Sequence, residues 1–118
     1  MRIYIAGPYG KRNNAENHTL EQNVQVAISV ARELIARGHE PLVPHLYHFV
    51  DLDWEETCGE DRWLEICLSW IPCCDALYYI GPSYGADTEK AKAELLNIPV
   101  YETMEDIPDV GWKQYYVK

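Results

Sequence analysis

The chain has 118 residues, of which 47% are hydrophobic and 25% charged, and its formal net charge is −9. This length predicts a single domain over residues 1–118, large enough to bury a hydrophobic core. No segment approaches the roughly 20 apolar residues that span a bilayer, and the N-terminus lacks the long apolar run of a signal peptide. We therefore expect a cytoplasmic protein without membrane contact.

The acidic charge argues against nucleic acid as a partner, because no basic stripe is present to neutralise many phosphates. A single phosphate held by backbone N–H groups is still compatible with an acidic protein.

The four cysteines of the chain are expected to be reduced thiols, which is typical of the cytosol. They do not form paired CxxC motifs, and adding His45 and His48 gives no recognised ligand spacing. Core thiols with loop histidines are therefore a better interpretation than a metal site. We predict no metal and no cofactor for the chain, whose cysteines are Cys58, Cys67, Cys73 and Cys74.

The first half of the chain predicts a strand, a long helix and a second strand. Residues 2–6 (RIYIA) form a short apolar run that ends at Gly7 and Pro8, and the polar stretch 9–18 is expected to be a loop. Thr19 and Gln22 have the spacing of a capping box. Apolar residues then recur at helical spacing up to Gly38, which is expected to end the helix. Residues 41–44 (PLVP) are the expected second strand, and residues 45–56 a loop or broken helix.

The second half continues the alternation. Residues 60–71 are expected to form a helix that Pro72 ends or kinks, and residues 76–80 (ALYYI) a strand buried on both faces. Residues 87–96 predict a third helix with Asn97 as its C-cap, and residues 98–101 a fourth strand. An aromatic cluster closes the chain, namely Trp112, Tyr115 and Tyr116.

Strands that alternate with helices predict an α/β fold, in which a parallel sheet is covered by helices on both faces. Right-handed crossovers leave few topologies. We therefore expect a three-layer open parallel sheet of four to five strands, flavodoxin- or Rossmann-like.

Ligands of open α/β sheets bind beyond the carboxyl ends of the strands. Three loops leave the predicted strands there, at residues 7–10, 44–48 and 81–87, and a small sugar- or phosphate-bearing ligand is expected between them.

Glu89 is expected in the first turn of a helix, where the helix dipole favours its ionised form. In this position its carboxylate could attack an anomeric carbon. The alternative is that Asp87 is an N-cap and Glu89 a surface acid. Tyr4 either contacts Glu89 or packs in the core, and His45 and His48 are either acid–base groups or polar surface.

Four segments of the chain carry a family resemblance. The order IYIAGPYG, GHEPLVPHL, CDALYYIGPSYGADTEKAKA and IPVY, from residue 2 to about residue 101, resembles the nucleoside 2-deoxyribosyltransferase superfamily. The chain is most similar to the compact deoxyribosyltransferase-like members, and it also resembles the 2′-deoxynucleoside 5′-monophosphate N-glycosidases.

This resemblance implies cleavage or transfer of an N-glycosidic bond through a glutamate nucleophile, which carries over to Glu89. It implies that Tyr4 is the hydrogen-bond partner of this glutamate and that Ser83 contacts a 5′-phosphate. A histidine (His45 or His48), Asp87 or Asp61 is a candidate proton donor to the departing base. The chain departs from the family pattern at Cys67, where the enzymes carry an aspartate. The predicted substrate-binding residues are Gly7, Pro8, Tyr9, Gly10, His45, Ser83 and Gly85.

The resemblance also implies a homodimer or larger homo-oligomer, and the aromatic tail offers anchors of the kind found at interfaces. A tail folded back on its own core would have the same sequence pattern.

The alternative function is a non-catalytic nucleotide- or nucleotide-sugar-binding module. The thiol of Cys67 favours this alternative, because a thiol is a poor replacement for a carboxylate as a hydrogen-bond acceptor.

Overall fold

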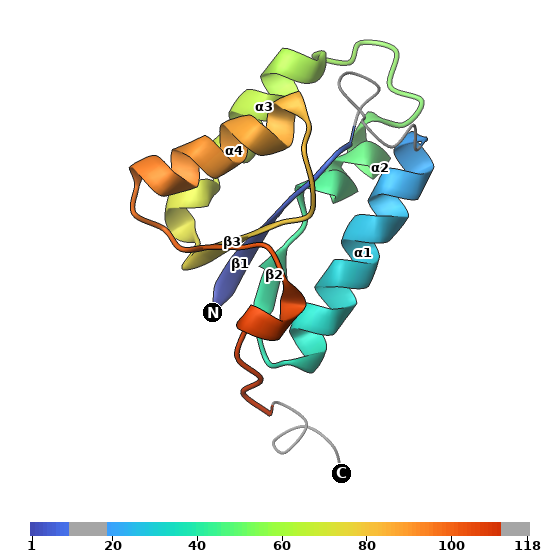
Figure 1. The fold of residues 1–118 in the computed structure, drawn as a ribbon. Helices are drawn as coiled ribbons and strands as arrows, with labels where there is room; N and C mark the ends of the chain where they lie inside the picture. Colours follow the sequence, from blue (N-terminus) through green and yellow to red (C-terminus); the bar gives the residue numbers. More distant parts are fainter. Residues whose placement is uncertain (10–18, 112–118) are drawn as a thin grey trace.

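The computed structural model describes residues 1–9 and 19–111, which form an α/β fold (Figure 1). Its four strands form one parallel sheet in the order β2-β1-β3-β4. The strands are β1 (Arg2–Ala6), β2 (Glu40–Leu42), β3 (Ala76–Tyr79) and β4 (Val100–Tyr101). The α-helices are α1 (Leu20–Ala36), α2 (Tyr47–Asp51), α3 (Glu60–Leu68) and α4 (Tyr84–Leu95). Short 3₁₀ helices η1 (Pro44–Leu46), η2 (Ile71–Cys73) and η3 (Met104–Asp106) complete the described chain.

Alternate residues of β1 pack into two separate cores, because successive side chains of a strand point to opposite faces of the sheet. Ile3 and Ile5 pack against α1, in a cluster that includes Leu34. Tyr4 and Ala6 pack on the opposite face, in a cluster that includes residues of α3 and α4. The predicted three-layer parallel sheet is therefore confirmed, with four strands.

Local signals explain both ends of α1. The Thr19 side chain accepts a hydrogen bond from the Gln22 backbone and the Gln22 side chain accepts one from the Thr19 backbone, which confirms the capping box. At the other end Gly38 has a φ of 93°, in the left-handed region that glycine adopts without strain. The backbone N–H of His39 then reaches the Leu34 carbonyl and satisfies an end group of the helix.

Several predicted boundaries are wrong by one to three residues. The second strand begins at Glu40 and stops before Pro44, which starts η1. Helix α3 ends at Leu68, ahead of the predicted end, and Pro72 lies within η2 instead. The fourth strand is confined to Val100 and Tyr101. Residues 10–18 of the predicted loop at 9–18, and the aromatic tail at 112–118, lie outside the described residues.

Helix α4 begins at Tyr84, three residues before the predicted start, because Ser83 is its N-cap. The Ser83 hydroxyl accepts a hydrogen bond from the backbone N–H of Ala86 at 3.0 Å. The alternative that Asp87 is the N-cap is therefore wrong. Asp87 lies one turn into the helix and accepts a hydrogen bond from the Tyr79 hydroxyl at 2.6 Å.

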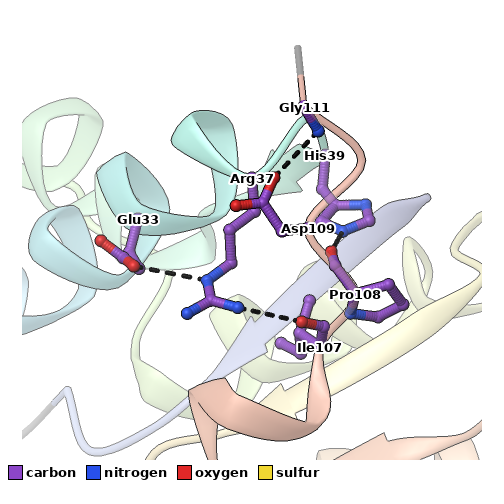
Figure 2. A network of polar contacts seen from close by, with 7 residues as sticks. All are labelled: Glu33, Arg37, His39, Ile107, Pro108, Asp109 and Gly111. Carbon is purple, nitrogen blue, oxygen red and sulfur yellow. Dashed lines mark hydrogen bonds and ion pairs between the residues drawn. The ribbon is translucent and has the colours of Figure 1, made fainter. Parts of the chain in front are cut away.

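The segment after β4 is held against the C-terminal end of α1 (Figure 2). Arg37 donates to the Ile107 carbonyl at 3.1 Å while its Nε contacts Glu33 at 3.3 Å. His39 Nε2 donates to the Pro108 carbonyl at 2.6 Å. Ile107 is 1% exposed and belongs to the α1-side cluster, so these bonds close that side of the core.

Within residues 1–9 and 19–111, no helix has the length and apolar character needed to cross a membrane.

Candidate functional site

A cleft of about 400 Å³ opens beyond the carboxyl ends of β1 and β3. The strand order places this cleft where the chain switches direction, since β2 lies on one side of β1 and β3 on the other. Five parts of the chain supply its walls: the loop after β1, the start of α1, the η1–α2 segment, the chain around α3, and the first turns of α4. The lining residues are Gly7, Tyr9, Leu20, Pro44, His45, Tyr47, Asp51, Thr57, Gly59, Glu60, Trp63, Leu64, Cys67, Ser83, Tyr84, Gly85, Ala86 and Glu89.

Glu89 reaches the cleft from the buried face of α4. Ala86, Glu89 and Ala93 share this face at helical spacing. Glu89 is 6% exposed, and its carboxyl accepts a hydrogen bond from the hydroxyl of the fully buried Tyr4. The structure thus brings together Tyr4 and Glu89, which lie 85 residues apart in the sequence.

The electrostatics of Glu89 differ from the sequence-based expectation. Glu89 is the sixth residue of α4, beyond the first turn, and it is buried. Burial raises the pKa of Glu89 to about 8, although the hydrogen bond from Tyr4 lowers this pKa. The expectation that Glu89 lies in the first turn of the helix is wrong, and so is the alternative of a surface acid. The pKa of the Tyr4 hydroxyl is raised, by burial first and by Glu89 second, so Tyr4 remains a proton-bearing donor.

Cys67 lines the same cleft from α3. Burial, and next the charge of Glu89, raise the pKa of the thiol to about 12, while a hydrogen bond with Tyr4 lowers it. Cys67 is therefore a neutral thiol at physiological pH. Three elements, β1, α3 and α4, converge on this group of Tyr4, Cys67 and Glu89.

His45 forms a second buried part of the cleft wall, on η1. Its Nε2–H donates to the carbonyls of Gly7 and Pro8, each at 3.2 Å. Because both partners are acceptors, Nε2 carries the proton and Nδ1 carries the lone pair. Burial lowers the pKa of His45 to about 4, so the ring is neutral at pH 7. Among the residues that the structure describes, none donates to the buried Nδ1.

Tyr9 lies between the two histidines of the η1–α2 segment. Its ring centroid is 6.2 Å from that of His45 and 6.0 Å from that of His48, with edge-to-face geometry in both pairs. The Tyr9 hydroxyl is 3.3 Å from His48 Nδ1. Burial, and then the charges of Asp51 and Glu60, raise the pKa of Tyr9 to about 12.

An aromatic wall, defined here as Tyr47 and Trp63, faces the cleft from α2 and α3. Their ring centroids are 5.1 Å apart with an interplanar angle of 34°. Asp51 lies beside this wall and accepts hydrogen bonds from Trp63 Nε1 at 3.1 Å and from the Thr57 hydroxyl. Sequence reasoning missed this wall and Asp51. The signal was the concentration of aromatic and acidic residues at 45–56, which was interpreted only as loop or broken helix.

The other predicted site residues fall into three groups. Gly7, Ser83 and Gly85 line the cleft, and a Cβ added at Gly7 would approach the Ile80 side chain to 2.9 Å. Pro8 contributes its carbonyl to His45 but does not line the cleft. Asp87 is exposed and does not line the cleft either, and Gly10 lies outside the described residues.

In the described part of the chain, no group of three or more His, Cys, Asp and Glu side chains is arranged to hold a metal ion. The groups available in the cleft are instead a buried carboxyl, a neutral thiol, a neutral imidazole and aromatic rings. Such a set suits an organic ligand with a planar ring and hydrogen-bonding groups.

Comparisons with known proteins agree with this fold. A solved structure of a 2-deoxyribosyltransferase from Bacillus psychrosaccharolyticus matches with a TM-score of 0.58 and 20% identity, over 85% of this chain and 69% of that chain. At this identity the likeness shows the shared fold. No curated protein sequence matches the chain significantly. The family model of a domain of unknown function, DUF7768, matches residues 1–103. The chain therefore belongs to the DUF7768 family and has the α/β fold of a 2-deoxyribosyltransferase.

Proposed function

We propose that the chain cleaves or transfers the N-glycosidic bond of a nucleoside or a (deoxy)nucleoside 5′-monophosphate, with Glu89 as the nucleophile. The observation that carries this proposal is a glutamate buried in a cleft at the carboxyl edge of the sheet and hydrogen-bonded by Tyr4. The fold neighbour is a 2-deoxyribosyltransferase, which supports nucleoside glycosyl transfer as the general reaction class.

The proposed reaction has two steps. In the first, a carboxylate oxygen of Glu89 attacks the anomeric carbon, the C–N bond breaks, and the base leaves with the electron pair and takes a proton from water. The product is a glycosyl ester of Glu89. In the second step, water or a ring nitrogen of another base attacks the same carbon, the carboxylate of Glu89 leaves, and the attacking group gives its proton to the solvent, where it neutralises the hydroxide left by the first step. A water nucleophile gives hydrolysis, and a base gives transfer.

Glu89 must lose its proton before it attacks. Its pKa of about 8 means that the carboxyl is mostly protonated at pH 7. The Tyr4 hydroxyl donates to the carboxylate and so favours the reactive form. In this proposal Tyr4 positions the nucleophile, and the start of α4 at Ser83 and Gly85 faces the sugar or its phosphate. Asp87 has no part in the proposed mechanism, since it does not line the cleft.

The alternative is a non-catalytic nucleotide- or nucleotide-sugar-binding module. One observation favours it: Cys67, a neutral thiol, lies beside a glutamate that is itself mostly protonated at neutral pH. In that case the cleft would hold its ligand without breaking a bond.

A chromatographic assay for free base separates the two functions. Purified protein is incubated with nucleosides and 5′-monophosphates in both deoxy and ribo forms, and thermal unfolding is measured with the same compounds. We expect base release from at least one substrate. Ligand-dependent thermal stabilisation without any base release would support the binding module instead.

The remaining proposals concern assembly and location. We propose that the chain forms a homodimer or larger assembly, supported by the exposed apolar side chains of Phe49, Val50 and Leu52 in and after α2. A cytoplasmic location, the extension of the domain over the whole of residues 1–118, and the lack of nucleic-acid partners stay predictions.

A further inference from the structure

The aromatic side of the cleft presents a fixed hydrogen-bond acceptor. Asp51 closes α2 and accepts from Trp63 Nε1 at 3.1 Å and from the Thr57 hydroxyl, and both donors bind the same oxygen, Oδ1. These two bonds orient the carboxyl group beside the indole edge. A carboxylate has about four acceptor positions. Asp51 therefore keeps acceptor capacity for a group bound in the cleft, which it lines.

The neighbouring aromatic wall provides a flat apolar surface. Tyr47 and Trp63 pack with their ring centroids 5.1 Å apart, and Trp70 Nε1 donates to the Tyr47 hydroxyl at 3.1 Å. These contacts hold the wall in place before a ligand arrives. Aromatic faces bind planar heteroaromatic rings by stacking. The ring of a ligand on this wall would lie next to the carboxyl group of Asp51.

We propose that the cleft selects a base with an exocyclic amino group, such as adenine or cytosine, and that Asp51 is the specificity-determining residue that accepts from this group. This inference rests on the proposed function and names its substrate class. In hypoxanthine or uracil a carbonyl oxygen replaces the amino group. That oxygen would face the Asp51 carboxylate, so two acceptors would meet without a proton between them.

Free bases test this inference without requiring catalysis. Dissociation constants are measured by NMR titration of the full chain with adenine, hypoxanthine, cytosine and uracil. We expect adenine to bind at least about tenfold more tightly than hypoxanthine, and cytosine to bind more tightly than uracil by a similar factor. The reason is that each carbonyl base loses the hydrogen bond to Asp51 and gains a repulsion between two acceptors. Equal affinities within each pair would overturn the inference.

Asp51→Asn is the matching variant. The amide oxygen still accepts from Trp63 and Thr57, whereas the amide nitrogen becomes a donor that suits a carbonyl. We expect the preference for the amino base to fall below about threefold or to reverse, since the amide donor removes the repulsion that rejects the carbonyl. The control is Asp53→Asn, since Asp53 does not line the cleft and has a φ of 58°, a conformation that Asn tolerates. An unchanged preference in Asp51→Asn, or the same loss in Asp53→Asn, would contradict the assignment.

The two proposals fail separately. If amino bases are preferred but no nucleoside is cleaved, the assignment of Asp51 stands and the glycosidase function is wrong. If nucleosides are cleaved without preference for amino bases, the reverse holds. If no base binds and no nucleoside is cleaved, both proposals are wrong.

Discussion

At the scale of single residues, the main feature is the buried carboxyl of Glu89. Burial raises its pKa to about 8, and the hydrogen bond from Tyr4 acts in the opposite direction. A nucleophile needs the ionised form, so activity should follow the deprotonation of this group. The account therefore predicts that kcat/KM of the wild type rises as the pH increases through about 8.

Tyr4→Phe tests the role of the hydrogen bond. Removing the hydroxyl takes away the interaction that lowers the pKa of Glu89, so this pKa should rise further and the pH–rate profile should move to higher pH. Tyr79→Phe is the matched control, because the Tyr79 hydroxyl binds Asp87, which does not line the cleft. A profile that moves to lower pH in Tyr4→Phe, or one that moves equally in the control, would show that Tyr4 does not tune Glu89.

At the scale of elements, the position of Glu89 depends on where α4 begins. Ser83 caps the helix by accepting from the Ala86 backbone, and this sets the turn that directs Glu89 into the cleft. Ser83→Ala should lower the free energy of unfolding by about 1 kcal/mol, the usual effect of losing such a cap. Urea denaturation measures this change.

Ser29→Ala is the control for the cap. Ser29 is exposed in the middle of α1, and its hydroxyl donates only to the Gln25 carbonyl of its own helix among the described residues. Its replacement should change the free energy of unfolding by less than about 0.5 kcal/mol. If both alanine variants lose the same stability, the cap does not define the start of α4.

Sequence reasoning succeeded for elements whose signals are local. The capping residues Thr19 and Gln22 and the apolar run of β1 act within a few residues, and both are found as expected. The start of α4 was missed because its cap lies within the run GPSYG, where glycine and proline indicate a loop. A cap of this kind is defined by the backbone geometry that it stabilises, which the spacing of apolar residues does not reveal.

The candidate site was predictable only in part. The rule that ligands bind at the carboxyl edge located the loops at 7–10 and 81–87, and the family resemblance singled out Gly7 and Ser83 within them, both of which line the cleft. Asp51 was not found, because its role depends on Trp63 and Thr57 folding back onto α2. The burial that raises the pKa of Glu89 also depends on packing between elements, and therefore no local pattern indicates it.

At the scale of the whole molecule, the strand order explains why residues far apart in the sequence meet in the cleft. With β1 and β3 adjacent in the middle of the sheet (Figure 1), the hydroxyl of Tyr4 on β1 reaches Glu89 of α4. The segment around η3 is bound to the C-terminal end of α1 and the residues after it through Arg37 and His39 (Figure 2).

The most direct test of the central claim is the rate of base release by Glu89→Gln, measured beside the wild type and beside Glu94→Gln. Glutamine keeps the size of the side chain but removes the nucleophilic carboxylate, while Glu94 lies exposed on the same helix. The account predicts that Glu89→Gln loses at least about a thousandfold in rate, as expected when a covalent nucleophile is removed, and that Glu94→Gln matches the wild type. Base release by Glu89→Gln at the wild-type rate would show that Glu89 is not the nucleophile.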